Sequence, residues 1–186
     1  MKTYSIVIQP SDSVIAEVKQ MKELLASKIG WYNSKNSLAH ITVNEFERDE
    51  QELESIKNKL TEIIRYFKAQ EVRFTHFDTF PNGAFFLAPD EDSKVYLKKI
   101  MASVHQKFPY PVKIKSNEPH ISIGRRIQPE KMGIAKNLFS ENPNISFTCD
   151  TIALRVFNEE RKQFDIIATF PFLGETSQDT IQGTLF

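Results

Sequence analysis

Two copies of one short pattern hold the residues best suited to chemistry. The sequences HITV, residues 40–43, and HISI, residues 120–123, both read histidine, apolar, hydroxyl, apolar. In a β-strand alternate side chains share a face, so each histidine and its hydroxyl point one way while the apolar residues point the other. The sequence therefore predicts two strands that each present an imidazole and a hydroxyl on one side and are anchored in a core on the other.

The chemistry of such a pair is proton transfer around a phosphate. One of the two imidazoles, His40 or His120, would accept a proton as general base while the other donates one as general acid. The hydroxyls of Thr42 and Ser122 would donate hydrogen bonds to non-bridging phosphate oxygens. We expect an in-line displacement, for which a cyclic phosphodiester is an apt substrate. The residues leave open which histidine is the base.

The other two histidines lack the pattern and serve as internal comparisons. His76 is followed by Phe-Asp and His105 by Gln-Lys, so neither has a hydroxyl two residues later. We interpret His76 as an ordinary polar residue of a strand and His105 as part of a solvated helix face. If the two motifs were coincidental, their histidines would lie far apart or be packed against apolar neighbours.

Four further side chains are candidates for contact with a substrate. Arg125 and Arg126 follow the second motif, and because adjacent strand side chains diverge, we expect only Arg125 to enter the site. Arg155 either faces the same site or forms a surface ion pair, the role that exposure favours. Phe46 and Phe80 either stack on a base or belong to the core.

Charge and composition exclude several classes of protein. The chain has 24 Lys and Arg against 24 Asp and Glu, so the broad basic surface of a protein that grips long nucleic acids is not expected. With 40% apolar residues, including 15 phenylalanines, it can bury enough surface to fold. We therefore expect a folded monomer with a small, local site.

The remaining composition bears on compartment and cofactors. The single cysteine, Cys149, cannot form an intrachain disulfide, which favours the reducing cytoplasm. No apolar stretch is long enough for a signal peptide core or a membrane span. The acidic residues between 45 and 52 lack metal-ligand spacing and indicate the start of a helix. We expect neither a metal nor a cofactor.

Periodicity predicts helices mixed with strands that are mostly linked by hairpins. Helices are expected at 14–29, 49–66, 93–108 and 129–139, and strands at 4–9, 38–43, 72–80, 83–88, 120–124, 145–149, 151–158 and 164–172. This mixture indicates the α+β class. No linker divides the chain, so residues 1–186 are expected to form a single bilobal domain whose polar end, 173–186, is a loose tail.

The paired motifs resemble those of the 2H phosphoesterase superfamily, particularly its branch of bacterial and archaeal 2′-5′ RNA ligases and RNA 2′,3′-cyclic phosphodiesterases. The similarity extends over most of the chain, through the segments TYSIVI, HITVNEF, DTFPNGAFFLAP, HISIGR, TIALRVF and FDIIATF. It implies two pseudo-symmetric α+β lobes, with antiparallel sheets facing a central cleft and helices outside. Each lobe would contribute one histidine motif.

The resemblance also implies a function. It indicates a metal-independent phosphodiesterase that opens a 2′,3′-cyclic phosphate on an RNA end or a nucleotide, together with a reversible 2′-5′ RNA ligase activity. A binding protein that holds an RNA end or nucleotide without turnover is the alternative. The chain departs from the family at Ser122, where threonine is more usual, at Gly124, where alanine is frequent, and over 44–46, which replaces an apolar continuation.

Overall fold

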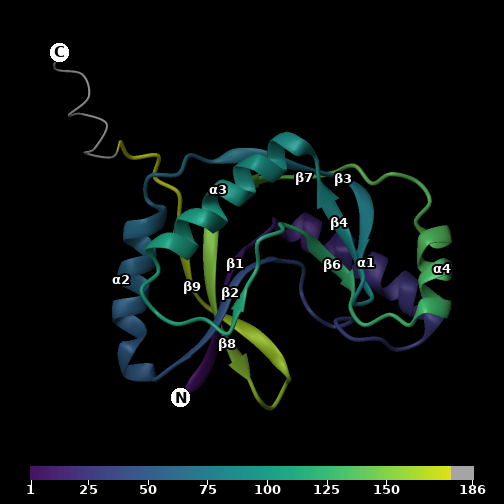
Figure 1. Cartoon of the computed structure of the whole chain (residues 1–186), viewed down its shortest axis with the longest axis horizontal. Coiled ribbons are helices and arrows are strands. Elements are labelled where there is room, and N and C mark those ends of the chain that lie inside the picture. The colour runs from purple at the N-terminus through teal and green to yellow at the C-terminus, as the bar shows by residue number, and fades with distance from the viewer. Residues whose placement is uncertain (177–186) are drawn as a thin grey trace.

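The strands of the computed structural model, which describes residues 1–176, form two antiparallel sheets (Figure 1). The larger sheet has the order β5-β2-β1-β8-β9, with β1 at Lys2–Ile8, β2 at Ile41–Arg48, β5 at Ile114–Lys115, β8 at Thr151–Asn158 and β9 at Gln163–Pro171. The smaller sheet has the order β6-β4-β3-β7, with β3 at Gln70–Phe80, β4 at Ala84–Pro89, β6 at Ile121–Gly124 and β7 at Ile145–Cys149. Each histidine motif thus belongs to a different sheet.

The helices form where apolar side chains recur at three and four residues. They are α1 at Asp12–Ile29, α2 at Leu53–Ile64, α3 at Glu91–Lys107 and α4 at Pro129–Leu138, and a short 3₁₀ turn at Glu50–Glu52 precedes α2. Gly30 ends α1 at φ 77°, a conformation that costs glycine little. The Asp90 side chain accepts a hydrogen bond from the Ser93 amide and caps the N-terminus of α3.

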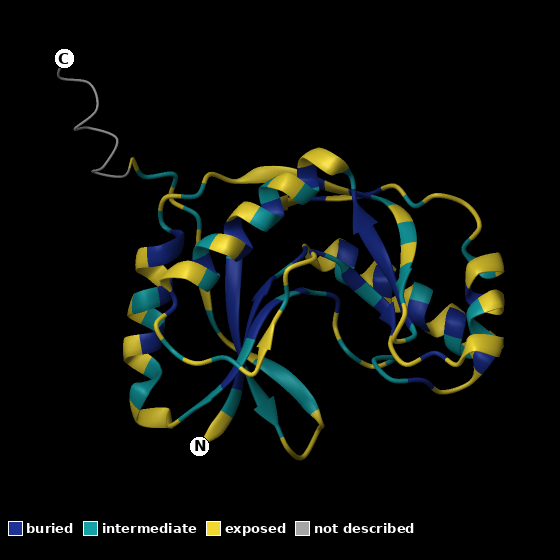
Figure 2. Ribbon diagram, in the orientation of Figure 1, coloured by how far each residue is buried: buried dark blue, intermediate teal, exposed yellow. Residues whose placement is uncertain are grey.

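Helices α2 and α4 lie at opposite edges of the molecule, and α3 crosses between its two halves (Figure 1). Helix α1 contacts α4 and strands β6 and β7 of the smaller sheet, whereas α2 contacts β9 of the larger one. Helix α3 contacts both β3 and β2, and so joins the two sheets. Figure 2 shows exposed residues on the outer surfaces of the helices and buried residues along the central strands.

One hydrophobic cluster runs through both sheets. It includes Ile6 and Ile41 of the larger sheet, Phe85 and Ile121 of the smaller sheet, and Leu97 of α3, all essentially inaccessible to solvent. Burial on this scale is the main favourable contribution to folding. The motif strands are therefore fixed from behind by their apolar residues, Ile41 and Ile121 among them.

The structure confirms the α+β class with two antiparallel sheets, and corrects some boundaries. Strand β2 continues to Arg48, so the prediction that the acidic residues from 45 onward begin a helix was wrong for the first two, Glu45 and Glu47. The two-residue strand β5 was not predicted, because a run so short has no periodicity. No helix of the described residues is long and apolar enough to cross a membrane.

The polar C-terminal segment is described only in part. The amides of Leu173 and Glu175 donate hydrogen bonds to the Arg65 carbonyl at 3.2 and 3.1 Å, and the Arg65 and Glu175 side chains form an ion pair at 2.6 Å. Residues 177–186 of the expected loose tail lie outside the described residues. The single-domain organisation over 1–186 stays a prediction.

Gly124 gives a test of packing at the end of the second motif strand. A Cβ added there would lie 2.5 Å from Ile127 Cδ1, and the Ile127 side chain would have to turn away, so Gly124→Ala should lower the free energy of unfolding by about 0.5–1.5 kcal/mol in chemical denaturation. In an Ile127→Val background the clashing methyl is gone, and the cost of Gly124→Ala should fall. An equal cost in both backgrounds would contradict this account.

Candidate active site

The two motifs come together at one cavity between the sheets. The cavity has a volume of about 530 Å³, and its lining includes His40, Thr42, His120, Ser122, Arg125 and Phe80. His40 and Thr42 lie at the start of β2, and His120 and Ser122 lie at the start of β6. We call this space the histidine cavity. It brings together the side chains that the sequence predicted to act on one phosphate.

Both imidazoles are held in the same way. His40 Nδ1 donates to the carbonyl of Leu38 at 2.6 Å, and His120 Nδ1 donates to the carbonyl of Glu118 at 2.8 Å. A carbonyl oxygen only accepts, so each Nδ1 carries a proton and the other ring nitrogen, Nε2, is left to exchange one. Each histidine can then act as a base when neutral or as an acid when charged.

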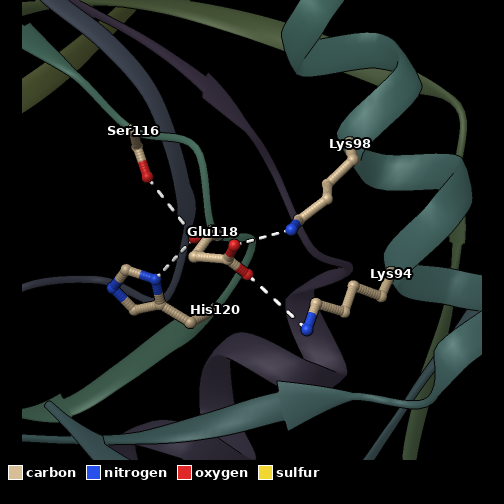
Figure 3. A network of polar contacts seen from close by, with 5 residues as sticks. All are labelled: Lys94, Lys98, Ser116, Glu118 and His120. Carbon is tan, nitrogen blue, oxygen red and sulfur yellow. Dashed lines mark hydrogen bonds and ion pairs between the residues drawn. The ribbon is translucent and has the colours of Figure 1, made fainter.

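The segment that holds His120 is fixed to α3 by charge (Figure 3). The Glu118 carboxylate accepts from Lys98 Nζ at 2.6 Å and forms an ion pair with Lys94 at 3.7 Å. Ser116 Oγ adds a weaker hydrogen bond to the Glu118 carbonyl at 3.4 Å. The carbonyl that orients His120 therefore belongs to a residue that is tied to a helix.

Aromatic rings restrain the other side of His120. The Phe80 ring lies edge to face with the imidazole, with centroids 5.2 Å apart, and the Phe86 ring lies at 4.9 Å. Phe80 thus lines the cavity while it packs on the histidine. Stacking of Phe80 on a substrate base stays a prediction.

A buried lysine fixes the loop that precedes His40. Lys22 of α1 is only 1% exposed, and its ammonium donates to the carbonyls of Ser34 and Ser37 at 3.2 and 2.7 Å and to Ser37 Oγ at 3.0 Å. Burial, together with the nearby Arg125 charge, lowers the pKa of Lys22 to about 8. The sequence analysis missed this residue because a lysine on a helix is ordinarily solvated.

A β-bulge follows the hydroxyl in each motif. Two consecutive residues of β1 pair with Thr42 and Asn44, so Val43 is skipped. In the same way, two consecutive residues of β4 pair with Ser122 and Gly124, so Ile123 is skipped. A bulge shifts the alternation of side chains by one position. As a result the third residue after each hydroxyl, Glu45 in one sheet and Arg125 in the other, lines the histidine cavity.

The same bulge explains why Phe46 belongs to the core, the second of its two expected roles. Without a bulge Phe46 would share a face with His40 and Thr42. In the structure it is 0% exposed and packs in the core against Tyr4 and Phe108, with ring centroids 5.7 and 4.9 Å away. Glu45 takes its place on the cavity side, and no side-chain pattern in the sequence marks that shift.

The two arginines after the second motif both reach the cavity. Arg125 was expected to enter it alone, but Arg126 lines it as well. Arg126 has φ 55°, in the left-handed region, so the strand alternation that would separate the two side chains ends there. The expectation that one of them points away was therefore wrong.

Arg155 of β8 is buried and does not form the expected surface ion pair. It is 4% exposed, its Nη2 donates to Ser5 Oγ at 3.0 Å, and its guanidinium lies over the Phe164 ring at 5.0 Å. Burial lowers its pKa to about 10, against an opposing effect of the Glu45 carboxylate. The residue lines a second cavity, which also contains His40 and Glu45.

The two comparison histidines lie outside the histidine cavity. His76 of β3 lines a different hollow, beside Asp78. His105 of α3 was expected on a solvated face, but it is half-buried and its Nε2 donates to the Val43 carbonyl at 3.3 Å. Val43 is the residue skipped by the bulge, and its carbonyl also accepts from the Ser116 amide at 3.0 Å.

The charges around the two catalytic candidates differ. Burial lowers the pKa of His40 well below 6.5, and the cationic side chains of Arg155, Lys22 and Arg125 lower it further. Burial also lowers the pKa of His120, where Arg125 acts in the same direction and the Glu118 carboxylate opposes it. His40 is thus more strongly disposed to be neutral than His120.

The burial of Glu45 has the opposite effect on its carboxyl. Burial raises the pKa of Glu45, and the neighbouring Arg125 and Arg155 guanidinium groups oppose that rise.

A metal site is not apparent among the described residues. Residues 1–176 contain no group of three or more His, Cys, Asp or Glu side chains placed to hold an ion.

The fold and the paired motifs define a 2H phosphoesterase. The family model of the 2′-5′ RNA ligase superfamily matches residues 10–161, and the chain belongs to that superfamily. Membership supports a phosphoesterase-type activity. No curated protein matches the chain in sequence.

Solved structures share the fold at low sequence identity. E. coli LigT complexed with NADP+ is 11% identical, with a TM-score of 0.62 over 92% of this chain and 98% of that one. TT0787 of Thermus thermophilus is 18% identical, with a TM-score of 0.62 over 95% and 100% of the two chains. Usb1 of Kluyveromyces marxianus is 13% identical, with a TM-score of 0.56 over 92% and 98%.

Lys22 gives a test of how the first motif is supported. In Lys22→Met the Ser34 and Ser37 carbonyls lose their buried donor, so the free energy of unfolding should fall by about 1–3 kcal/mol. Lys19→Met on the exposed face of the same helix, where a 3.9 Å ion pair with Glu23 is lost, should change it by less than about 0.5 kcal/mol. Equal effects of the two variants in urea denaturation would refute the supporting role.

Proposed function

We propose that this protein is a metal-independent phosphodiesterase that opens a 2′,3′-cyclic phosphate on an RNA end or a nucleotide. The observation that carries the proposal is the pair of imidazoles at one cavity, each with Nδ1 bound to a carbonyl and Nε2 left for proton exchange. The superfamily supports a phosphoesterase-type activity, and the finer assignment rests on this geometry.

The reaction needs one proton taken and one proton given. One imidazole Nε2 removes a proton from water as the water oxygen attacks phosphorus. The bond from phosphorus to one ribose oxygen breaks, and the other imidazole gives its Nε2 proton to that oxygen. The product is a ribose monophosphate with a free neighbouring hydroxyl, and the two histidines exchange protons with solvent before the next turnover.

The surroundings support different roles for the two histidines. His40 has three cationic neighbours that favour its neutral form, so it is the base. His120 lies near the Glu118 carboxylate, which favours its charged form, so it is the acid. A bound phosphodiester anion would favour the charged form of His120 further.

The remaining polar groups hold the phosphate. The Thr42 and Ser122 hydroxyls donate to its non-bridging oxygens from opposite sides, and Arg125 supplies a positive charge beside them. These contacts strengthen as negative charge grows in the transition state. When the 5′-hydroxyl of another RNA replaces water as the nucleophile and the 3′ oxygen leaves, the same proton transfers form a 2′-5′ linkage, so 2′-5′ RNA ligase activity is part of the proposal.

Complexes of a protein with the same fold support a nucleotide substrate. Crystal structures of E. coli LigT exist with phosphate and with 3′-AMP. A ribonucleoside monophosphate is the kind of product that opening a cyclic phosphate would release. The proposed substrate class is therefore an RNA or nucleotide end rather than a long nucleic acid.

The histidines are tested by substitution. With a 2′,3′-cyclic nucleotide as substrate, His40→Ala and His120→Ala should each lower kcat by roughly 10²–10⁴-fold, because each removes one proton transfer. The double variant should lose much less than the product of the two factors, since both groups act in one transition state. Thr42→Ala and Ser122→Ala should each lose less than either histidine variant.

The matched control for these variants is His76→Ala, which should leave kcat within about twofold of the unmodified protein. Circular dichroism confirms that each variant is folded. Full turnover by folded His40→Ala and His120→Ala proteins would show that the phosphate chemistry lies elsewhere.

The pH dependence follows from the lowered pKa values. The free protein needs neutral His40 and charged His120, and the pKa of each is below 6.5. Activity should therefore be lost as pH rises through the pKa of His120 and also as pH falls through the lower pKa of His40. We expect a bell-shaped profile of kcat/KM with its maximum below pH 6.5; a maximum above pH 7 would contradict the role assignment.

A further inference from the structure

A second cavity adjoins the histidine cavity, and the proposed reaction does not use it. It has a volume of about 520 Å³ and shares His40, Glu45 and Arg125 with the histidine cavity. Its other side is formed by the β8–β9 hairpin, through Arg155, Phe157 and Phe164. We call it the hairpin cavity. A substrate group attached to the phosphate would have direct access to it.

A row of polar side chains crosses the larger sheet beside this cavity. In the strand register Ser5 pairs with Glu45 on one side and with Arg155 on the other, so the three side chains share one face. Arg155 Nη2 donates to Ser5 Oγ at 3.0 Å and fixes the guanidinium. The row thus places a carboxylate and a guanidinium on either side of a small residue.

Both ends of this row have unused hydrogen-bonding capacity. Arg155 Nε is buried and has no partner within the described residues. The half-buried Glu45 carboxylate accepts no hydrogen bond from any side chain or amide of residues 1–176, although Arg125 and Arg155 are close enough to affect its pKa. A buried donor without a partner is costly, and the Glu45 carboxylate lines the cavity as an acceptor, so the row is suited to a ligand that offers both an acceptor and a donor.

The hairpin supplies an aromatic surface next to this row. The Phe157 and Phe164 rings lie edge to face with centroids 5.2 Å apart, and the Arg155 guanidinium stacks on Phe164 at 5.0 Å. Flat rings beside a fixed donor and acceptor match a flat heterocycle with polar edges. A second phosphate would find cations in this lining, Arg126, Arg161 and Lys162 among them, but it would leave the Glu45 carboxylate without a donor.

We propose that the hairpin cavity binds the nucleobase next to the cyclic phosphate, and that Glu45 selects bases by accepting a hydrogen bond from an exocyclic amino group. This inference rests on the proposed function, because it takes the phosphate to lie in the histidine cavity. Arg155 would donate to a ring nitrogen or carbonyl of the same base. Glu45 is then a specificity-determining residue, placed there by the bulge in β2.

A comparison of cytosine with uracil distinguishes base selection by Glu45 from a site that binds any base. The two bases have the same size, but cytosine has an amino group at position 4 where uracil has a carbonyl oxygen. A carboxylate accepts from the amino group and repels the oxygen. The protein should therefore prefer cytidine to uridine 2′,3′-cyclic phosphate by about tenfold in kcat/KM.

The direct test is Glu45→Gln, which keeps the size of the side chain and removes its charge. Its amide can either donate or accept, so the cytidine preference should fall to within about threefold of equality. Glu47→Gln is the matched control, since Glu47 lies two residues further along β2 and pairs with Lys113 at the surface. It should keep the full preference. An unchanged ratio in Glu45→Gln, or no preference in the unmodified protein, would overturn the inference.

Binding separates this inference from the proposed function. Calorimetry with cytidine and uridine 3′-monophosphates gives a Kd for each nucleotide. The ratio of the two Kd values reports the preference for cytidine without any turnover. Absence of hydrolysis would contradict the proposed function, whereas an equal Kd for the two nucleotides would contradict the role of Glu45. Phe157→Leu should weaken the binding of both nucleotides by a similar factor, because stacking does not distinguish the two bases. A change in the ratio of the two Kd values would contradict the assignment of stacking to the phenylalanines and of base selection to Glu45.

Discussion

The hydrogen bond from each imidazole Nδ1 to the carbonyl two residues earlier is the constraint on which the site depends. It fixes the ring and leaves Nε2 for proton exchange. The bond requires that the preceding loop be held, and each loop is tied to a helix by charge: Lys22 binds the loop before His40, and Lys94 and Lys98 bind Glu118 before His120. The helix supplies a cation in both supports, but that cation binds neutral carbonyl and hydroxyl oxygens in the first loop and a carboxylate in the second.

That difference in charge gives different pKa values to the histidines of two similar strands. Burial lowers the pKa of both histidines, and the first also lies among cations whereas the second lies near a carboxylate, so the pKa of the first is the further below 6.5. The bulges extend the inequality, since they place an acidic residue, Glu45, in one sheet where the other has the basic Arg125. A fold with pseudo-symmetric lobes can thus bind an asymmetric substrate in one direction.

The sequence predicted what depends on side-chain periodicity. The α+β class followed from the mixture of helical and strand periodicities of the apolar residues, and the shared face of His40 and Thr42 followed from the alternation of side chains along a strand. Bulges depend on main-chain pairing between distant strands, so the exchange of Phe46 for Glu45 had no local signal. Lys22 and Arg155 were missed or misplaced for another reason: long cationic side chains are ordinarily exposed, and their burial follows from tertiary contacts such as the Ser37 and Ser5 hydrogen bonds.

The central claim is that two oriented histidines direct the opening of a cyclic phosphate without a metal. The most direct measurement is identification of the product when the protein is incubated with a nucleoside 2′,3′-cyclic phosphate in the presence of a chelator. If His40 is the base and His120 the acid, one ribose oxygen always faces His120 as the leaving group, and a single monophosphate isomer is expected. A mixture of 2′ and 3′ isomers, or turnover that stops with the chelator and returns with an added metal, would contradict the account.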